Sequence, residues 1–249
     1  MKEKISGLII TYNEEKNIRE VLECFNFCNE IILVDSFSTD RTVEIAQQNP
    51  KVKICQQEFV DYTKQRNKAI SLAENDWIFF LDGDERTTPE LEKEIIETVN
   101  RNDAKDAYYI YRIFFVGKKK INFSGTQNDK NFRLFRKSKA HYIENKKVHE
   151  TLDVKGTTGI LTHKLLHYSF ENFETFKKKM LYYGFLKGTE LAEKGKKYSV
   201  FTHWSKVAFK FIKTYFIKLG ILDGINGVKI CYLQSLYVDE TYQTLKRKT

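Results

Sequence analysis

The amino-acid sequence predicts an α/β fold with a mostly parallel central sheet, antiparallel additions and a helical C-terminal extension. Strand-like and helix-like segments alternate in the N-terminal part, as is typical of a parallel sheet covered by helices. After Asp106 the chain becomes aromatic and β-rich, and from Phe173 it becomes helical and rich in lysine. With 249 residues, 41% of them hydrophobic, the chain can form one large domain or a domain with an appendage.

The alternating elements follow one another closely. Strands are expected at 5–10, 31–34, 52–55 and 77–81, and helices at 13–22, 38–46, 62–73 and after Thr88. Asn13 is expected to cap the first helix, and Thr88 followed by Pro89 is a typical helix start. Asp40 is the better capping candidate for the second helix, which leaves Asp35 for a ligand. Shorter strands are expected at 108–116, 119–123 and 131–135, where they would extend the sheet.

The most informative segment is Trp77–Glu85, in which an apolar run ends in two carboxylates, Asp82 and Asp84. Such a run suits a strand buried on both faces, so both acids would project from the carboxyl edge of the sheet, where open α/β folds bind ligands. Two acids there repel each other unless a cation lies between them. A hard divalent ion, Mg²⁺ or Mn²⁺, takes oxygen ligands and bridges to phosphates. A solvated turn with a helix cap behind it is the alternative.

Two other strand ends, Thr11–Glu14 and Asp35, would lie at the same edge. A carboxylate there can hold ribose hydroxyls or a base N–H, because it accepts two donors at once. Together with a metal held by the paired acids, these groups describe a nucleoside-diphosphate pocket. The glycine-rich signatures of dinucleotide-binding dehydrogenases and of P-loop enzymes are both absent, so these classes are disfavoured.

Several segments, in this order, resemble family 2 glycosyltransferases: Ile9–Glu15, Ile32–Thr42, Gln65–Asn67 and Leu81–Glu85. Later segments are similar to the bacterial lipopolysaccharide-core β-1,4-glucosyltransferase subgroup: Phe132–Arg136, Val148–Glu150, Leu166–Ser169 and Leu222–Gly227. The resemblance covers nearly the whole chain. It departs from the subgroup at Gly125–Asp129, where an aromatic-Pro-Asp stretch is usual and where the acceptor side is expected to be shaped.

The resemblance implies a Rossmann-like GT-A fold, a UDP-sugar donor, a divalent metal and inversion at the anomeric carbon. Donor binding would involve Thr11, Asn13, Glu14 and Asp35 at the uridine, Arg66 near the base or the diphosphate, Asp82 at the ribose or the metal, and Asp84 at the metal directly. The expected parts are a nucleotide-sugar-binding half at 1–105, an acceptor-side half of the same domain at 106–170, and a helical, basic, amphipathic extension at 171–249.

An inverting transfer needs a base that takes the proton of the acceptor hydroxyl, a contribution of ~10²–10⁴-fold. We assign this role to Glu150, which follows a β-type stretch and stands beside His149; a loop acid paired with nearby lysines is the alternative. Asp129 is the second candidate. The charge on the leaving diphosphate would be met by the metal at Asp84 and by Arg133 or Arg136.

His167 is a candidate metal ligand through a neutral imidazole, with a structural, hydrogen-bonded histidine as the alternative. Because Asp82 and Asp84 precede it in the same expected pocket, the metal set would be Asp84, Asp82 and His167.

The C-terminal part carries a basic amphipathic pattern in a chain of formal net charge +9. Between His203 and Leu219, three lysines (Lys206, Lys210, Lys213) share one helical face, and Trp204, Phe211, Tyr215 and Leu219 lie on the opposite one. This pattern predicts a helix lying on an anionic membrane surface, with an ordinary docked surface helix as the alternative. The chain lacks an RNA-binding signature, so no nucleic acid partner is expected.

The sequence shows no signal-peptide pattern, no apolar stretch of about 20 residues and four scattered cysteines, which suit a reducing compartment. We therefore expect a cytoplasmic enzyme, peripheral at the inner face of the cytoplasmic membrane. It would move a hexose, with glucose as the expected sugar, to a lipopolysaccharide-core or other lipid-linked glycan acceptor. A non-catalytic carbohydrate- or nucleic-acid-binding protein on the same scaffold is the alternative.

Overall fold

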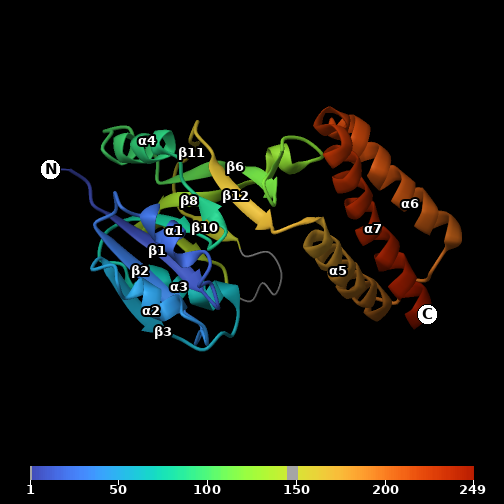
Figure 1. Ribbon diagram of the computed structural model, residues 1–249, viewed down its shortest axis with the longest axis horizontal. Coiled ribbons are helices and arrows are strands. Elements are labelled where there is room, and N and C mark those ends of the chain that lie inside the picture. Colours follow the sequence, from blue (N-terminus) through green and yellow to red (C-terminus); the bar gives the residue numbers. More distant parts are fainter. Residues whose placement is uncertain (1, 145–150) are drawn as a thin grey trace. The chain divides into compact units, whose positions relative to one another are not determined.

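The computed structural model describes residues 2–144 and 151–249 (Figure 1). The chain forms two compact units. The first comprises Met1–Arg112 and Lys130–His167, and the second comprises Ile113–Asp129 and Tyr168–Thr249. Residues 106–170, expected as one acceptor-side half, are therefore shared between the two units.

The first unit is built on parallel strands: β1 (Ile5–Thr11), β2 (Glu30–Asp35), β3 (Val52–Gln56) and β4 (Trp77–Leu81). Their order is β3-β2-β1-β4, and each adjacent pair is parallel. All residues of β2 and β4 are buried, as expected for strands covered on both faces.

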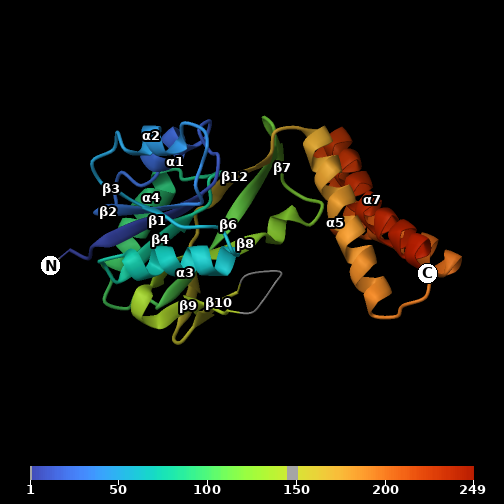
Figure 2. The ribbon, with the colours of Figure 1, turned by 90° about the horizontal axis from the view of Figure 1, so that it is seen from below.

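Helices cover both faces of this sheet (Figures 1 and 2): α1 (Ile18–Glu23), α2 (Thr42–Ala46), α3 (Tyr62–Leu72) and α4 (Pro89–Val99). Because side chains alternate along a strand, β1 sends Ile9 into one hydrophobic core, with α1 and α4, and Leu8 into a second core, with α3. Thr88 caps α4 by accepting from the backbone N–H of Leu91, as predicted.

Antiparallel strands extend the sheet beyond β4. β8 (Lys130–Arg136) pairs with β4, and β6 (Ala107–Val116) pairs with β8. Further strands are β12 (Leu165–Phe170), β5 (Glu85–Arg86), β7 (Lys119–Ile121) and β11 (Thr158–Ile160), while β9 (Ala140–Tyr142) and β10 (Leu152–Val154) form a separate hairpin. The predicted fold class, a mixed α/β sheet with antiparallel additions and C-terminal helices, is confirmed.

One expected helix start is wrong. α1 begins at Ile18, five residues after Asn13, whose φ of 56° places it in the left-handed region. Its side-chain oxygen accepts a hydrogen bond from the backbone N–H of Thr39 at 2.8 Å instead of capping a helix. The segment before α1 is thus fastened to the segment after β2.

The second unit contains three long helices, α5 (Phe173–Glu193), α6 (Val200–Ile212) and α7 (Gly224–Lys248) (Figure 1). A π-helical turn, η3 (Lys213–Ile217), continues α6, and a 3₁₀ turn, η4 (Gly220–Asp223), precedes α7. The segment Ile113–Asp129, which we call the inserted segment, also belongs to this unit. Its Val116 and Ile121 pack with Phe176, Ile230 and Leu233 in a core of this unit. Among the described residues, no helix is both long and apolar enough to traverse a bilayer.

Two glycines let α5 and α7 approach closely. A Cβ atom on Gly188 would lie 2.5 Å from the carbonyl oxygen of Thr241, and one on Gly184 would lie 2.7 Å from the carbonyl oxygen of Tyr237. Both obstacles are backbone atoms of a helix, which cannot swing aside. The contact therefore requires glycine.

We expect Gly188→Val to lower the stability of the protein, because the side chain would force the two helices apart. Overpacking of this kind costs about 1–3 kcal/mol. Lys178→Val, at an exposed position of the same helix, is the matched control and introduces the same residue without a clash. Thermal unfolding of both variants checks this; equal midpoints would contradict the packing described.

Candidate functional site

The carboxyl ends of β1, β2 and β4 meet at one edge of the sheet, because the three strands are adjacent and parallel. Thr11 stands opposite Asp35, and Ile9 stands opposite Leu81, the residue before Asp82. The structure therefore brings the predicted strand-end residues of the first unit to a common edge. This is the edge at which open α/β sheets bind ligands.

Asp35 is fully buried at the end of β2. Its carboxylate accepts hydrogen bonds from the Thr11 hydroxyl at 3.0 Å, the Ser38 backbone N–H at 2.8 Å and the Gln56 amide at 3.4 Å. Both oxygens are thus engaged with the chain itself, and they hold the turn after β2. A hydrogen-bond donor on a ligand at Asp35 would share or replace one of these contacts.

Glu14 lies beside the turn that carries the paired acids. Its carboxylate accepts from the Asn17 amide at 2.7 Å, and a Cβ atom on Gly83 would come within 3.0 Å of it. Burial raises the pKa of Glu14, the nearby charge of Asp84 raises it further, and the hydrogen bond from Asn17 opposes both. Glycine at position 83 therefore leaves room for the Glu14 carboxylate to lie against the turn.

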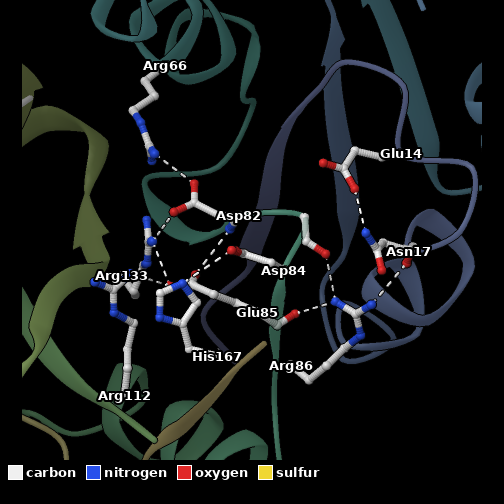
Figure 3. A network of polar contacts seen from close by, with 11 residues as sticks. Glu14, Asn17, Arg66, Asp82, Asp84, Glu85, Arg86, Arg112, Arg133 and His167 are labelled. Carbon is white, nitrogen blue, oxygen red and sulfur yellow. Dashed lines mark hydrogen bonds and ion pairs between the residues drawn. The ribbon is translucent and has the colours of Figure 1, made fainter. Parts of the chain in front are cut away.

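Asp82, at the end of β4, is held by two arginines (Figure 3). Arg66 Nη2 lies 2.7 Å from Oδ1, and Arg133 Nη2 binds Oδ2. Burial opposes ionisation, but the charges of Arg133 and Arg66 outweigh it and hold the pKa of Asp82 well below its usual range. Each oxygen of the Asp82 carboxylate is therefore bonded to one arginine and keeps a further lone pair.

Glu85 completes this network of ion pairs, and its role was not predicted from the sequence. Its side chain is fully buried, 2.7 Å from Arg133 and 3.0 Å from Arg112, and it also accepts from the Asp82 backbone N–H at 3.1 Å. Arg86 donates to the Gly83 carbonyl at 2.8 Å on the other side of the turn. The signal that could have found Glu85 is its position directly after the acidic pair, in a stretch that is otherwise buried.

Asp84 faces His167 rather than the arginines (Figure 3). His167 Nε2 lies 3.3 Å from Asp84 Oδ2, and the pairing of β12 with β5 sets His167 opposite Glu85. Burial acts to raise the pKa of Asp84, but the hydrogen bond and charge of His167 outweigh it, so the pKa is lowered. At 41% side-chain exposure, against 26% for Asp82, Asp84 is the more accessible acid.

A carboxylate facing an imidazole is a donor set that fits a divalent cation. In the described part of the chain, no three histidine, cysteine or acidic side chains are grouped as a complete metal site. A cation at Asp84 and His167 would therefore take its other ligands from a bound diphosphate and from water. That is the usual arrangement for Mg²⁺, which keeps several ligands outside the protein.

The two residues predicted as the catalytic base do not belong to the described part of the first unit. Glu150, with Lys146, Lys147 and His149, lies outside the described residues. Asp129 belongs to the second unit, where it borders a hollow near Lys213.

The role expected for Arg136 beside the leaving group is wrong. Arg136 stands opposite Trp77 at the start of β4, with its guanidinium 4.4 Å from the centre of the indole ring and 3.2 Å from Asp76. Because β8 runs antiparallel to β4, Arg136 lies about 16 Å of strand away from the end that carries Asp82. Arg133, three residues earlier, is the arginine that reaches the acidic turn.

The chain is similar to proteins of one known family. Residues 6–163 match the model of glycosyl transferase family 2. An uncharacterized glycosyltransferase of Rickettsia typhi is 31% identical over 240 residues, which cover 90% of this chain and 80% of that protein. The lipopolysaccharide core biosynthesis glycosyltransferase LpsC of Rhizobium meliloti is 26% identical over 241 residues, covering 92% and 89%.

Among solved structures, residues 1–349 of TarS from S. aureus in complex with UDP have a similar fold. The TM-score is 0.52 at 18% identity, covering 98% of this chain and 90% of that one. The same protein in complex with UDP-GlcNAc also gives a TM-score of 0.52, at 16% identity.

We expect Arg133→Leu to destabilise the protein by about 3–5 kcal/mol, because it leaves the buried Glu85 and Asp82 short of positive charge. Arg101→Leu is the matched control: it removes an exposed pair with Asp103, worth about 1 kcal/mol or less. Urea unfolding of the two variants checks the difference. If Arg133→Leu unfolded at the same urea concentration as Arg101→Leu, the network would not have the structural role described.

Proposed function

The chain belongs to glycosyl transferase family 2, and we propose that it moves a hexose from a UDP-sugar to a lipid-linked or lipopolysaccharide-core acceptor. Glucose is the expected sugar. The transfer would proceed with inversion at the anomeric carbon. The observation that carries the proposal is the Asp84–His167 pair at the end of β4, beside the ends of β1 and β2. The similarity of the fold to TarS with bound UDP supports the choice of nucleotide.

Each strand end has a distinct part in donor binding. Thr11, Asn13 and Asp35 would meet the uridine, with Asp35 exchanging one of its present donors for one on the nucleotide. Arg66 lies next to Asp82 and would remain close to the base or the diphosphate. Asp82 would accept a ribose hydroxyl, because its position is fixed by the two arginines while part of its side chain remains exposed.

Asp84 and His167 would hold the divalent metal, Mg²⁺ or Mn²⁺. When bound, such an ion neutralises the diphosphate and stabilises the charge that develops on the leaving oxygen. The lowered pKa of Asp84 keeps this carboxylate ionised and ready to bind at neutral pH. Glu14, whose pKa is raised, lies close to Asp84 and is placed to accept a hydrogen bond from the donor or its water.

The acceptor hydroxyl must lose its proton as it attacks the anomeric carbon. We assign the base to Glu150, with Asp129 as the second candidate, and either would act by positioned proton transfer. The similarity to LpsC supports a lipopolysaccharide-core acceptor.

Contact with an anionic membrane would bring the enzyme to such an acceptor. The helices of the second unit leave large apolar side chains exposed, including Phe201 at 83%, Ile225 at 67% and Ile217 at 65%. Lysines lie among them, as in helices that rest on a bilayer surface. The exposed apolar surface is broader than the sequence pattern indicated, since Phe209 and Ile212 also face solvent.

Donor binding is tested by thermal unfolding with UDP and Mn²⁺. A ligand at a hundredfold excess over its Kd stabilises the native state by about 2.7 kcal/mol. We expect this stabilisation in the wild type, its loss on metal removal with EDTA, and its loss in Asp84→Asn. Asp103→Asn, an exposed acid of the first unit, is the control and should behave like the wild type. Stabilisation by RNA but not by UDP with Mn²⁺ would instead favour a non-catalytic binding protein.

The base is tested by two matched variants. We expect Glu150→Gln to bind UDP normally and to transfer sugar ~10²–10⁴-fold more slowly, because it cannot accept the proton. Asp129→Asn is expected to retain most of its transfer rate. Full transfer by Glu150→Gln together with a slow Asp129→Asn would move the assignment to Asp129.

The membrane contact is tested by flotation with vesicles of phosphatidylcholine and phosphatidylglycerol. Phe201→Ser/Ile217→Ser should recover at least ~10-fold less protein with the vesicles, because each side chain contributes about 1.5–3 kcal/mol when fully buried. Phe59→Ser/Val60→Ser removes exposed apolar side chains of the first unit and should float like the wild type. Equal recovery of both variants with the vesicles would refute the proposal that the surface around Phe201 and Ile217 contacts the membrane.

A further inference from the structure

A hollow of about 450 Å³ lies within the second unit, whereas the residues assigned to the donor belong to the first unit. Three lysines line it, Lys210, Lys213 and Lys218, together with Gly125, Thr126 and Asn128. We call it the lysine hollow. Most of its lining comes from two segments distant in sequence, the loop before β8 and the end of α6 with η3, and Phe114 of β6 and Gln234 of α7 complete it.

The π-helical turn explains why the three lysines share one hollow. In a regular α-helix, Lys218 would point about 140° away from Lys213, because each residue turns the chain by about 100°. Here the Lys218 backbone N–H donates to the carbonyl of Lys213 at 2.8 Å, a bond spanning five residues. This wider turn brings Lys218 beneath Lys213. Such turns are rare and are often found at functional sites.

The hollow is held open by a fixed frame of hydrogen bonds. The Lys218 carbonyl accepts from the Ser124 backbone N–H at 2.9 Å and from the Gln127 amide at 3.1 Å. The Gln234 amide of α7 donates to the Ser124 carbonyl at 3.0 Å. The loop is therefore tied to both neighbouring helices without using a lysine ammonium group.

Glycines make this frame possible. A Cβ atom on Gly220 would lie 2.7 Å from Cys231 Sγ, and one on Gly227 would lie 1.8 Å from the Gly220 carbonyl oxygen. Asp223 accepts from the backbone N–H groups of Asn122 and Phe123 at 3.0 and 2.8 Å. The Leu222–Gly227 segment singled out in the sequence thus builds the frame of the lysine hollow.

The lysines of the hollow carry positive charge that is not paired with an acidic side chain. Within the described parts of the chain, none of the three lysines forms an ion pair with an acidic side chain. Six lysines and no acidic residue occur from Lys196 to Leu222, and Asp129 is the acid that lines the hollow. Burial and the neighbouring charge of Lys213 both lower the pKa of Lys210, so a bound anion would relieve an existing repulsion.

We propose that the lysine hollow binds a phosphate group. Three lysines that line one hollow supply the ammonium donors from which phosphate oxygens accept hydrogen bonds. Exposed apolar side chains follow directly in sequence, Phe216, Ile217 and Leu219, so that a phosphate carried on a lipid could place its chain beside them. A phosphate on a soluble sugar would use the lysines alone.

This inference rests on the proposed function in one respect: the phosphate would belong to the acceptor or to the lipid around it. The hollow is built in part from Gly125–Asp129, the segment at which the sequence departs from the resembling subgroup. A phosphate contact here would help to select the acceptor, and the departure from the subgroup would then reflect a different acceptor.

The probe for phosphate itself is inorganic pyrophosphate, titrated into the full chain at constant ionic strength and with EDTA. Amide NMR signals of Thr126, Lys213 and Lys218 should shift and saturate. Lys210→Gln/Lys213→Gln/Lys218→Gln should bind at least ~10-fold more weakly, because three charge-assisted hydrogen bonds are lost. Lys196→Gln/Lys197→Gln/Lys206→Gln removes the same charge outside the hollow and should bind like the wild type.

Vesicles distinguish a lipid phosphate from a soluble one. With phosphatidylcholine vesicles containing phosphatidic acid, a lipid source predicts that the hollow variant loses more binding than the control variant. Equal vesicle binding together with different pyrophosphate binding would identify a soluble phosphate. If the hollow and control variants lost pyrophosphate binding equally, or if shifts occurred in the first unit alone, the inference would be overturned.

The two proposals fail separately. Asp84→Asn is expected to lose metal-dependent UDP binding while keeping the pyrophosphate shifts of the second unit. Absence of UDP binding in the wild type would refute the proposed donor and leave the lysine hollow standing. Absence of the pyrophosphate shifts with intact UDP binding would refute the hollow alone.

Discussion

The candidate site depends on one buried ion network, in which Arg133 is shared by Asp82 and Glu85. Burying these ions is costly, and the cost is offset only where opposite charges meet at hydrogen-bonding distance. Arg66 and Arg112 supply the further positive charge, one for each acid. The turn after β4 is thereby fixed, and with it the direction in which Asp84 points.

The same network divides the two acids of the D-x-D segment between different tasks. Asp82 faces the arginines and is part of the structure, whereas Asp84 faces His167 and keeps more of its surface exposed. Gly83 between them has no side chain, which lets Glu14 approach from the adjacent strand end. A single turn thus combines an anchored carboxylate with an accessible one.

Local sequence signals predicted most of the fold, because they depend on neighbouring residues. The apolar run of β4 and the Thr88–Pro89 helix start are examples, and both were found where expected. The Arg133–Glu85 pair joins residues 48 positions apart, so no local pattern could reveal it. Arg136 was misplaced for a related reason: its distance from the acidic turn depends on the antiparallel direction of β8. The lysine hollow depends on a π-helical turn that a helical pattern does not show.

The second unit is discontinuous in sequence, and this limits where the chain can be shortened. Val116 and Ile121, from the inserted segment, are 2% and 1% exposed because they pack with Phe176, Ile230 and Leu233 from the C-terminal helices. Removing those helices by a stop codon after His167 would leave two apolar side chains in water. The C-terminal helices and the Ile113–Asp129 segment therefore have to be kept or removed together in any shortened form of the protein.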